Sequence, residues 1–318
     1  MSKIGFIFLF VFSVFLAEAQ TGIQFEITVA QDGSGDFESI QAAIYATKAY
    51  PPQRITIFIK KGLYREKVCV PSWNNKLSLI GEDRDNTIII WDDYFNKINR
   101  GRNSTFFTYT LKVEADDFNA ENLTISNAAG PVGQAVALHV VGNRCRFKNC
   151  KFLGNQDTAF LDGENSNQLF ENCIITGTTD FIFGSATVVF HKCTIISKKD
   201  SYITAASTTK GKAFGFVFID CKLNADEGVE NVYLGRPWRP YAKTVFINCY
   251  LGGHICQDGW AAWSNKEDKS ATYYAEYNNT GPGANTLRVK WANQLSSKEA
   301  SKYTLKNILG EWTAKSYK

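Results

Sequence analysis

The chain has 318 residues, of which 44% are hydrophobic and 21% charged, so it can bury a large core and is not intrinsically disordered. The formal net charge of +4 suits an acidic partner, although solubility explains it as well, and we expect neither nucleic acid nor a membrane as a partner. Three His and no Cys-x-x-Cys pattern give a zinc or haem site little to build on, so we expect no metal and no cofactor.

The first residues have the pattern of a secretory signal peptide. Lys3 supplies the positive start, residues 4–17 form an apolar run, and Ala17-Glu18-Ala19 is a small-x-small cleavage pattern. The apolar run is short for a membrane span. We therefore predict a signal peptide over residues 1–19, cleavage near Ala19-Gln20, and a secreted protein, extracellular, in the cell wall or in the periplasm, in which residues 20–318 form one domain.

One short helix is predicted near the start of this domain. Apolar side chains at helical spacing run from Ile40 to Thr47, where Thr47 is the weakest member because it offers only a methyl group. The stripe follows Ser39 and stops before Pro51, as expected for an amphipathic helix with a capped start and a proline stop.

A six-residue pattern then recurs along the chain: aromatic, any, polar, Cys, any, and aliphatic or aromatic. Five copies begin at Phe147, Phe170, Phe190, Phe218 and Phe246, and a degenerate copy begins at Ala120. Within each copy the apolar residues alternate, as on a strand with one buried face. Turns rich in Gly, Asn and Asp separate the copies, and no helical pattern lies between them. The repeat predicts an all-β fold, a parallel β-solenoid whose coils stack on one another.

Five of the eight Cys occupy one position of this repeat, namely Cys150, Cys173, Cys193, Cys221 and Cys249. In a secreted protein they could form disulfides. They could equally form a ladder of small buried thiols, and we favour this second interpretation. Cys69, Cys145 and Cys256 lie outside the ladder, and the sequence does not pair them.

A second short helix is predicted near the C-terminus. Ser296-x-x-Glu299 is a capping-box pattern. A solenoid needs covers over its open ends, so we expect this helix and the N-terminal one to be short capping helices.

The repeat also places three polar residues in register. Gln134, Asp157 and Asp180 are separated by 23 and 23 residues, the same step as from Phe147 to Phe170. If the coils stack, we expect their side chains to lie side by side on three neighbouring coils. Two carboxyl groups about 5 Å apart do not both stay ionised without help, and such splitting makes one an acid and the other a nucleophile or base.

Register alone leaves a second interpretation open. Asp200 lies as far after its Cys as the other two Asp do, and Asp residues also cap turns. The surroundings favour a site, because Gln156 adjoins Asp157 and because Arg236 lies beside Trp238 in a stiff Gly-Arg-Pro-Trp turn. Acid pair, amide donors, Arg and aromatic residues together are typical of a groove that acts on a sugar chain.

From about Glu26 to its end the chain resembles the pectin methylesterases (pectinesterases). The resemblance is carried by five segments in order: Gly62-Leu63-Tyr64-Arg65-Glu66, Gln134-Ala135-Val136-Ala137-Leu138, Gln156-Asp157-Thr158, Asp180-Phe181-Ile182-Phe183-Gly184 and Leu234-Gly235-Arg236-Pro237-Trp238. It implies a right-handed, single-stranded parallel β-helix and a secreted cell-wall enzyme of the form without an inhibitor-like pro-region. It also implies the reaction, removal of methyl groups from methyl-esterified galacturonate units to give pectate and methanol.

The resemblance further implies a role for each matching residue. Asp180 is the implied nucleophile, and Asp157 is the implied general acid and then base. Gln134 and Gln156 are the implied oxyanion donors, and Arg236 orients Asp180 and keeps it charged. The implied substrate-binding residues are Trp238, Thr105, Phe160, Phe183 and Trp260, together with Gln134 and Arg236. Methyl-esterified homogalacturonan is the expected partner of a monomer, and a proteinaceous inhibitor is a further partner that the resemblance allows.

Two other functions compete with this one. A glycan-cleaving β-helix enzyme, similar to a polygalacturonase, would also use paired carboxylates, but it gives no account of two converging Gln donors. A non-catalytic pectin-binding solenoid predicts a broken acid pair or a missing Arg, and the sequence shows neither. A narrower alternative is an esterase for other acyl esters.

Overall fold

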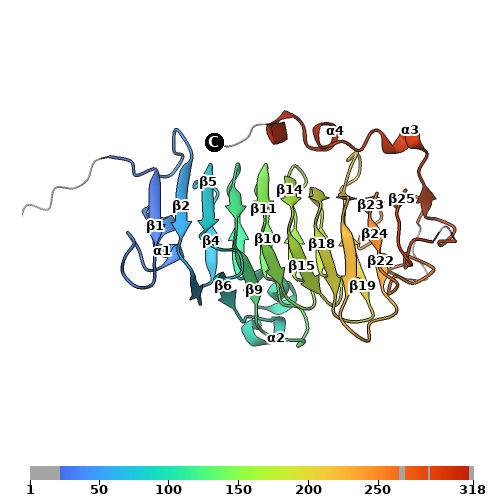
Figure 1. The fold of residues 1–318 in the computed structure, drawn as a ribbon, viewed down its shortest axis with the longest axis horizontal. Helices are drawn as coiled ribbons and strands as arrows, with labels where there is room; N and C mark the ends of the chain where they lie inside the picture. Colours follow the sequence, from blue (N-terminus) through green and yellow to red (C-terminus); the bar gives the residue numbers. More distant parts are fainter. Residues whose placement is uncertain (1–21, 265–268, 286, 315–318) are drawn as a thin grey trace, which may run out of the picture.

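The computed structural model describes residues 22–264, 269–285 and 287–314. The predicted signal peptide, residues 1–19, lies outside the described residues. Within them the chain winds into a stack of coils that carries three parallel sheets, as Figure 1 shows. The fold is a right-handed parallel β-helix, as predicted.

Most coils contribute one strand to each sheet, so neighbours within a sheet come from successive coils. The 11-stranded sheet contains β1 (Glu26–Val29), β2 (Ile55–Ile59), β5 (Leu77–Gly81), β8 (Asn119–Glu121), β11 (Cys145–Lys148), β14 (Asn167–Glu171), β17 (Thr187–His191), β20 (Phe216–Ile219), β23 (Lys243–Ile247), β25 (Tyr273–Tyr277) and β26 (Asn293–Gln294). The 8-stranded sheet contains β3 (Gly62–Tyr64), β6 (Thr87–Trp91), β9 (Thr124–Asn127), β12 (Lys151–Leu153), β15 (Ile174–Gly177), β18 (Thr194–Ser197), β21 (Lys222–Ala225) and β24 (Tyr250–Leu251). The 7-stranded sheet contains β4 (Val68–Val70), β7 (Leu111–Val113), β10 (Leu138–Val140), β13 (Ala159–Leu161), β16 (Ile182–Gly184), β19 (Tyr202–Ala206) and β22 (Tyr233–Gly235).

The predicted repeat lines the interior of the coils. Its aromatic residues pair in register and stack, with ring centroids 4.6 Å apart for Phe147 and Phe170 and 4.3 Å apart for Phe218 and Phe246. The five repeat cysteines are buried and free, so the thiol ladder is the correct interpretation. Cys69, Cys145 and Cys256 are free as well. Each rung thus adds the same apolar residues at the same place, which is why the repeat predicted stacking.

The turn before each repeat Cys needs an unusual backbone. Asn149, Asn172 and Asn248 have φ values of 50°, 52° and 53°, in the left-handed region that Asn adopts more readily than most residues. The Asn149 side chain also donates to the Asn122 side-chain oxygen one coil earlier, at 2.6 Å. A single left-handed residue therefore bends each coil from the 11-stranded sheet into the 8-stranded one.

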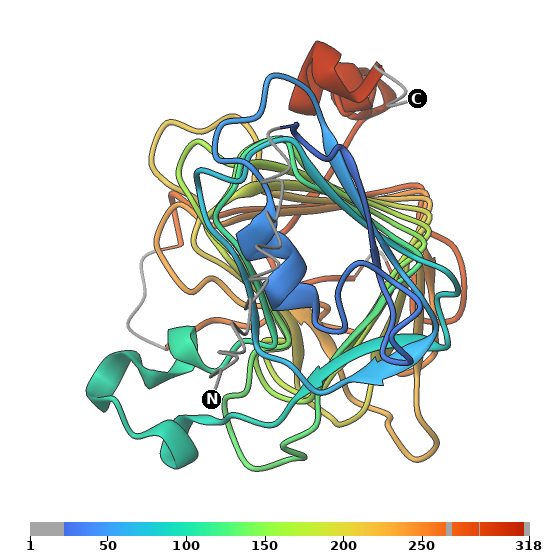
Figure 2. The ribbon, with the colours of Figure 1, turned by 90° about the vertical axis from the view of Figure 1, so that its left-hand side faces the viewer.

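The N-terminal helix covers the first open end, as predicted. α1 (Ile40–Ala46) buries Ile40, Ala43 and Ile44, and it lies across the end of the coils in Figure 2. Thr47, expected in the apolar stripe, is the C-cap residue instead. The Glu66 carboxylate accepts hydrogen bonds from the first backbone N–H groups of α1 at 3.0 and 2.9 Å, which stabilises the positive end of the helix.

The C-terminal helices do not cap the other end, so that expectation was wrong. The capping box of Ser296 and Glu299 does open α3 (Ser297–Ala300), and α4 (Leu305–Leu309) and η2 (Glu311–Ala314) follow. However, Ile308 and Leu309 pack on the outer face of the 11-stranded sheet, against the apolar side chains Leu169, Val189 and Val217. The helices therefore run along one side of the stack (Figure 1) because that side offers an apolar stripe. Trp260 and Tyr274, with Trp291 packed on Tyr274, contribute the large aromatic rings in the last coils.

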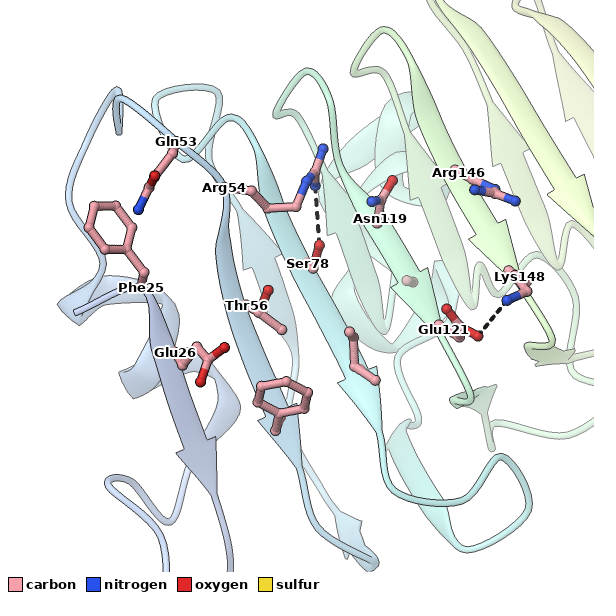
Figure 3. A pocket seen from close by; sticks show the side chains of 13 residues that line it. Phe25, Glu26, Gln53, Arg54, Thr56, Ser78, Asn119, Glu121, Arg146 and Lys148 are labelled. Atoms are coloured by element: carbon pink, nitrogen blue, oxygen red, sulfur yellow. Dashed lines mark hydrogen bonds and ion pairs between the residues drawn. The ribbon is translucent and has the colours of Figure 1, made fainter. Parts of the chain in front are cut away.

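The rest of this outer face is open and forms a trough over the first strands. Figure 3 shows side chains from β1, β2, β5, β8 and β11 that line it, in a space of about 440 Å³. Two of its basic residues are paired: Lys148 Nζ lies 2.8 Å from Glu121 Oε1, and Arg146 Nε lies 2.5 Å from Glu171 Oε2.

Two remaining helices, α2 (Phe95–Ile98) and η1 (Gly101–Phe107), project from the chain between β6 and β7. They bring residues 102–106 to the outer face of the 7-stranded sheet. No helix within the described part of the chain is long and apolar enough to cross a lipid bilayer.

Candidate active site

A second hollow, of about 320 Å³, lies on the outer face of the 7-stranded sheet. Most of the residues that the sequence singled out line it. These are Thr105, Gln134, Gln156, Asp157, Asp180, Phe183, Arg236 and Trp238. They come from segments spread over more than a hundred residues. The stacking of coils gathers those in or near strands of that sheet, and η1 brings Thr105 to them.

The register of the two aspartates is as predicted. β13 pairs with β16 so that Ala159 faces Ile182, which places Asp157 and Asp180 on neighbouring coils, about one strand spacing of 4.8 Å apart. Both have left-handed backbones, with φ of 63° and 49°. Asp180 N donates to Tyr202 O at 2.8 Å, which fixes the backbone of the second aspartate.

The register of Gln134 differs from the prediction. Gln134 pairs with Gln156 and not with Asp157, so the step at this point is 22 residues. The coils are not of equal length, because the turns between their strands vary. The side chains of parallel partners point to the same face, so the change brings the two amides together.

Asp200 does not belong to the site. Its carboxylate accepts backbone hydrogen bonds from Glu230 and Asn231, at 2.8 and 3.0 Å, which makes it the turn-capping residue that the alternative interpretation described. The same spacing from Cys thus gives a structural role in one coil and a place in the hollow in two others.

Arg236 holds Asp180 with two nitrogens on one edge of its guanidinium. Its Nε lies 2.9 Å from Asp180 Oδ1, and its Nη2 lies 2.6 Å from Oδ2. The pair is largely removed from water, since the side chains are 20% and 9% exposed. Such a bidentate pair fixes the orientation of the carboxylate as well as its charge.

The two aspartates titrate differently. Burial raises the pKa of the Asp157 carboxyl well above its ordinary value, and the Asp180 charge raises it further, while Arg236 opposes the rise. Burial also raises the pKa of Asp180, but the hydrogen bonds and the charge of Arg236 oppose this directly. The Asp157 carboxyl group has no hydrogen-bond partner among the described residues, although its backbone N–H donates to Thr179 O at 3.1 Å. The arrangement therefore favours one negative charge, held on Asp180, and one proton, held on Asp157.

The amide groups of Gln134 and Gln156 are available for a ligand. Neither side chain is hydrogen-bonded to another residue of the described chain, and both line the hollow beside the aspartates. Each amide carries two N–H donors. Together they can stabilise an oxygen that becomes negative next to Asp180.

Aromatic rings form the floor and one wall of the hollow. Phe183 stacks on Phe160 with centroids 4.7 Å apart and meets Trp238 edge to face at 5.9 Å. Phe160 lies beside Phe183 on the neighbouring strand, packs against Phe106 with centroids 4.8 Å apart, and does not line the hollow. Its expected contact with a substrate is therefore replaced by a packing role beside Phe183.

Trp260 was wrongly expected in the groove. It is only 1% exposed and packs in the interior against Tyr274, and its Nε1 donates to the buried Glu276 carboxylate at 3.2 Å. Trp263, three residues later, lines the hollow and is 40% exposed. Two Trp in one short segment gave no periodic pattern that would tell the inner residue from the outer one.

Sequence reasoning also missed other residues of the lining: Arg102, Phe106 and Ala205. Phe106 adjoins the expected Thr105, so its place could have been found from that neighbour. Arg102 and Ala205 carry no local signal, because the place of Arg102 depends on how η1 lies over the sheet and that of Ala205 on the pairing of β19 with β16.

Chemically, the hollow combines an oriented carboxylate, a protonated acid and amide donors, which is the set that acyl transfer through a covalent intermediate requires. No cluster of His, Cys, Asp or Glu in the described residues has the composition of a metal site.

Comparison with known proteins agrees with this chemistry. The profile of the family described as Pectinesterase matches residues 26–311. Pectinesterase 31 of Arabidopsis thaliana is 36% identical over 87% of this chain and 90% of its own length. A pectinesterase/pectinesterase inhibitor of Brassica campestris is 37% identical over 88% of this chain, which spans about half of that relative. The solved structure of pectin methylesterase from carrot superposes with a TM-score of 0.85 at 32% identity, over 94% of this chain and 98% of the carrot chain.

Proposed function

Because the chain belongs to the pectinesterase family, we propose that it hydrolyses the methyl esters of galacturonate units in pectin and releases pectate and methanol. One observation carries this proposal: Asp180, paired with Arg236, lies one coil away from the unpaired and buried Asp157. The family resemblance implies Asp180 as the nucleophile, and the different partners of the two carboxyl groups support the same assignment.

The first half of the reaction forms a covalent intermediate. The Asp180 carboxylate attacks the ester carbonyl carbon, and the carbonyl oxygen becomes an oxyanion. This oxyanion accepts hydrogen bonds from the side-chain N–H groups of Gln134 and Gln156. When this tetrahedral species collapses, the bond to the methoxy oxygen breaks and Asp157 gives its proton to that oxygen. Methanol leaves, and an anhydride between Asp180 and the galacturonate carboxyl remains.

The second half restores the enzyme. Asp157, now a carboxylate, takes a proton from water, and the resulting hydroxide attacks the galacturonate carbonyl carbon. The anhydride bond breaks, Asp180 returns as a carboxylate beside Arg236, and Asp157 is protonated again. Ester and water have become acid and methanol, with no other reactant consumed.

The test is methanol release from highly methylated pectin, measured together with the length of the polymer. We expect methanol without chain shortening from the wild type, and none from Asp180→Asn. Chain fragments without methanol would instead support the glycan-cleaving alternative. Tight pectin binding with neither product would support the binding-only alternative.

Two further properties are proposed with this function. The apolar start of the chain and Ala17-Glu18-Ala19 support secretion, which N-terminal sequencing of protein recovered from the medium would test; a mature start near Gln20 is expected. We also propose that the enzyme acts as a monomer on methyl-esterified homogalacturonan, and that a proteinaceous inhibitor can bind it. Sedimentation with and without a candidate inhibitor tests both statements.

A further inference from the structure

Tyr202, the first residue of β19, contacts both partners of the Asp180–Arg236 pair. Its backbone oxygen accepts the hydrogen bond from Asp180 N at 2.8 Å, and its ring lies 4.0 Å from the guanidinium carbon of Arg236. A second ring, that of Trp263, lies 4.2 Å from the same carbon. The guanidinium is thus held at its edge by a carboxylate and at its faces by aromatic rings.

The ring of Tyr202 is itself held in place. Tyr202 pairs with Tyr233 of β22, and the two rings stack with centroids 5.3 Å apart at 26°. Tyr233 is the first residue of β22, and Arg236 directly follows the last one. The segment that presents Arg236 therefore also carries the support for Tyr202. The orientation of the Tyr202 ring is therefore built into the pairing of β19 with β22.

A bidentate contact needs the guanidinium and the carboxylate to share a plane. A ring against the flat face of the guanidinium restricts tilting out of that plane, and it attracts the cation through its quadrupole. The ring also keeps water off that face, and a charge pair is stronger where water is excluded. Without it, Arg236 would still be present but would hold Asp180 less well.

We propose that Tyr202 is a positioning residue that clamps Arg236 in the plane of the Asp180 carboxylate and so keeps the nucleophile ionised. The proposal rests on the proposed function for its kinetic meaning, but its structural part does not need turnover. Trp263 is a less clean probe of the same effect, because it lines the hollow and its loss would also change substrate contacts. Tyr202 does not line the hollow.

The first experiment measures the titration of Asp180 in the enzyme without substrate. The carboxyl carbons of Asp are labelled with 13C, the Asp180 signal is assigned with Asp180→Asn, and its midpoint is followed by NMR. Arg236 and Asp157 are the charged groups that act on Asp180, so the lower of two coupled midpoints is read. In Tyr202→Leu we expect this midpoint to rise by about 0.5–1 pH unit, because Arg236 stabilises the anion less well.

Two matched variants separate positioning from general loosening. Tyr202→Phe keeps the ring, so its midpoint should equal that of the wild type. Tyr233→Leu removes the support of the Tyr202 ring but leaves that ring on Arg236, so it should lower the melting temperature and raise the midpoint by less than Tyr202→Leu does. An unchanged midpoint in Tyr202→Leu, or an equal rise in Tyr233→Leu, would overturn the proposal. Tyr202→Ile, which suits a strand better, gives the same test if the Leu variant fails to fold.

The second experiment is kinetic. In Tyr202→Leu, the acidic limb of the pH profile of kcat/KM should move upward, so that activity on the limb falls by up to about tenfold and recovers at higher pH. A loss that is equal at every pH would contradict the role. If the wild type releases no methanol from pectin, the proposed function fails, whereas the substrate-free titration still decides whether Tyr202 positions Arg236.

Discussion

Two hollows on the described surface differ in character, and the larger of these two is not the candidate active site. The trough on the 11-stranded sheet has about 440 Å³, against about 320 Å³ for the hollow on the 7-stranded sheet. In the trough, Lys148 is paired with Glu121 (Figure 3), and Arg146 is paired with Glu171; these side chains are between 18% and 44% exposed. In the hollow, Asp157 is 8% exposed and has no such partner among the described residues.

The difference shows what marks a reactive site in this fold. A stack of coils has grooves wherever its outward side chains are small, so the volume of a groove does not by itself indicate a reactive site. A buried carboxyl group without a partner is costly to ionise, and a fold keeps one only where something else requires it. Each prediction below tests whether the chemistry follows the buried carboxyl groups or the available space.

The largest effect is expected for the nucleophile. Asp180→Asn should lower kcat for methanol release by about 10⁴-fold or more, because the attacking carboxylate is gone and the remaining groups cannot replace it. Methanol release under saturating pectin measures this. Circular dichroism that matches the wild type is the control for folding, and a folded Asp180→Asn enzyme with wild-type activity would remove the assignment.

The next effect concerns the amide donors. Gln156→Ala should lower kcat by about 10²–10³-fold with little change in KM, since an oxyanion donor acts mainly in the transition state. Steady-state kinetics on methylated oligogalacturonates separate the two constants. A rise in KM alone would assign Gln156 to ground-state binding instead.

The third effect is smaller, and it is a gain in folding stability where the first two are losses of activity. The folded pKa of Asp157 lies above the unfolded value, so the unfolded chain loses this proton first, and the folded state loses stability as the pH rises above about 4. Asp157→Asn cannot ionise and escapes this loss. At pH 7 it should be about 0.5–2 kcal/mol more stable than the wild type, and near pH 3.5 the two should be equal. Urea unfolding at both pH values measures the difference; a variant that is less stable at pH 7 would show that the site holds no such strain.

The smallest effects are expected in the trough. Arg146→Gln and Lys148→Gln should change the free energy of unfolding by less than about 1 kcal/mol each, because they break ion pairs that remain in contact with water. Methanol release should stay within about twofold of the wild type. A tenfold loss in either variant would mean that the trough takes part in the reaction and that the comparison is mistaken.

The sequence predicted those parts of the structure that repeat from coil to coil. Phe147 and Phe170 occupy equivalent rungs because a stacked core needs the same volume at the same place, and this periodicity also set the register of Asp157 and Asp180. The register of Gln134 was off by one residue because turn length between coils is not part of the repeat. Periodicity therefore predicts strands better than the segments between them.

Features that depend on contacts between distant segments could not be predicted. Leu309 is apolar, but nothing near it in the chain indicates the stripe on the outer face of the sheet where it packs. Trp260 and Trp263 differ in environment only because one segment turns between them. Tyr202 gave no signal at all, since its role comes from the pairing of β19 with β22 and from the place where Arg236 ends.

The ladder of free thiols bears on how the protein can be made. All eight cysteines are reduced in this fold, and the five of the ladder are enclosed between coils. The fold therefore gives a thiol oxidase or a disulfide isomerase no bond to form or exchange. We expect expression in the reducing cytoplasm of a host cell to yield the same fold as expression by a secretory route. Thiol reductants added during purification have no covalent crosslink to break, so they leave the wound sheets intact.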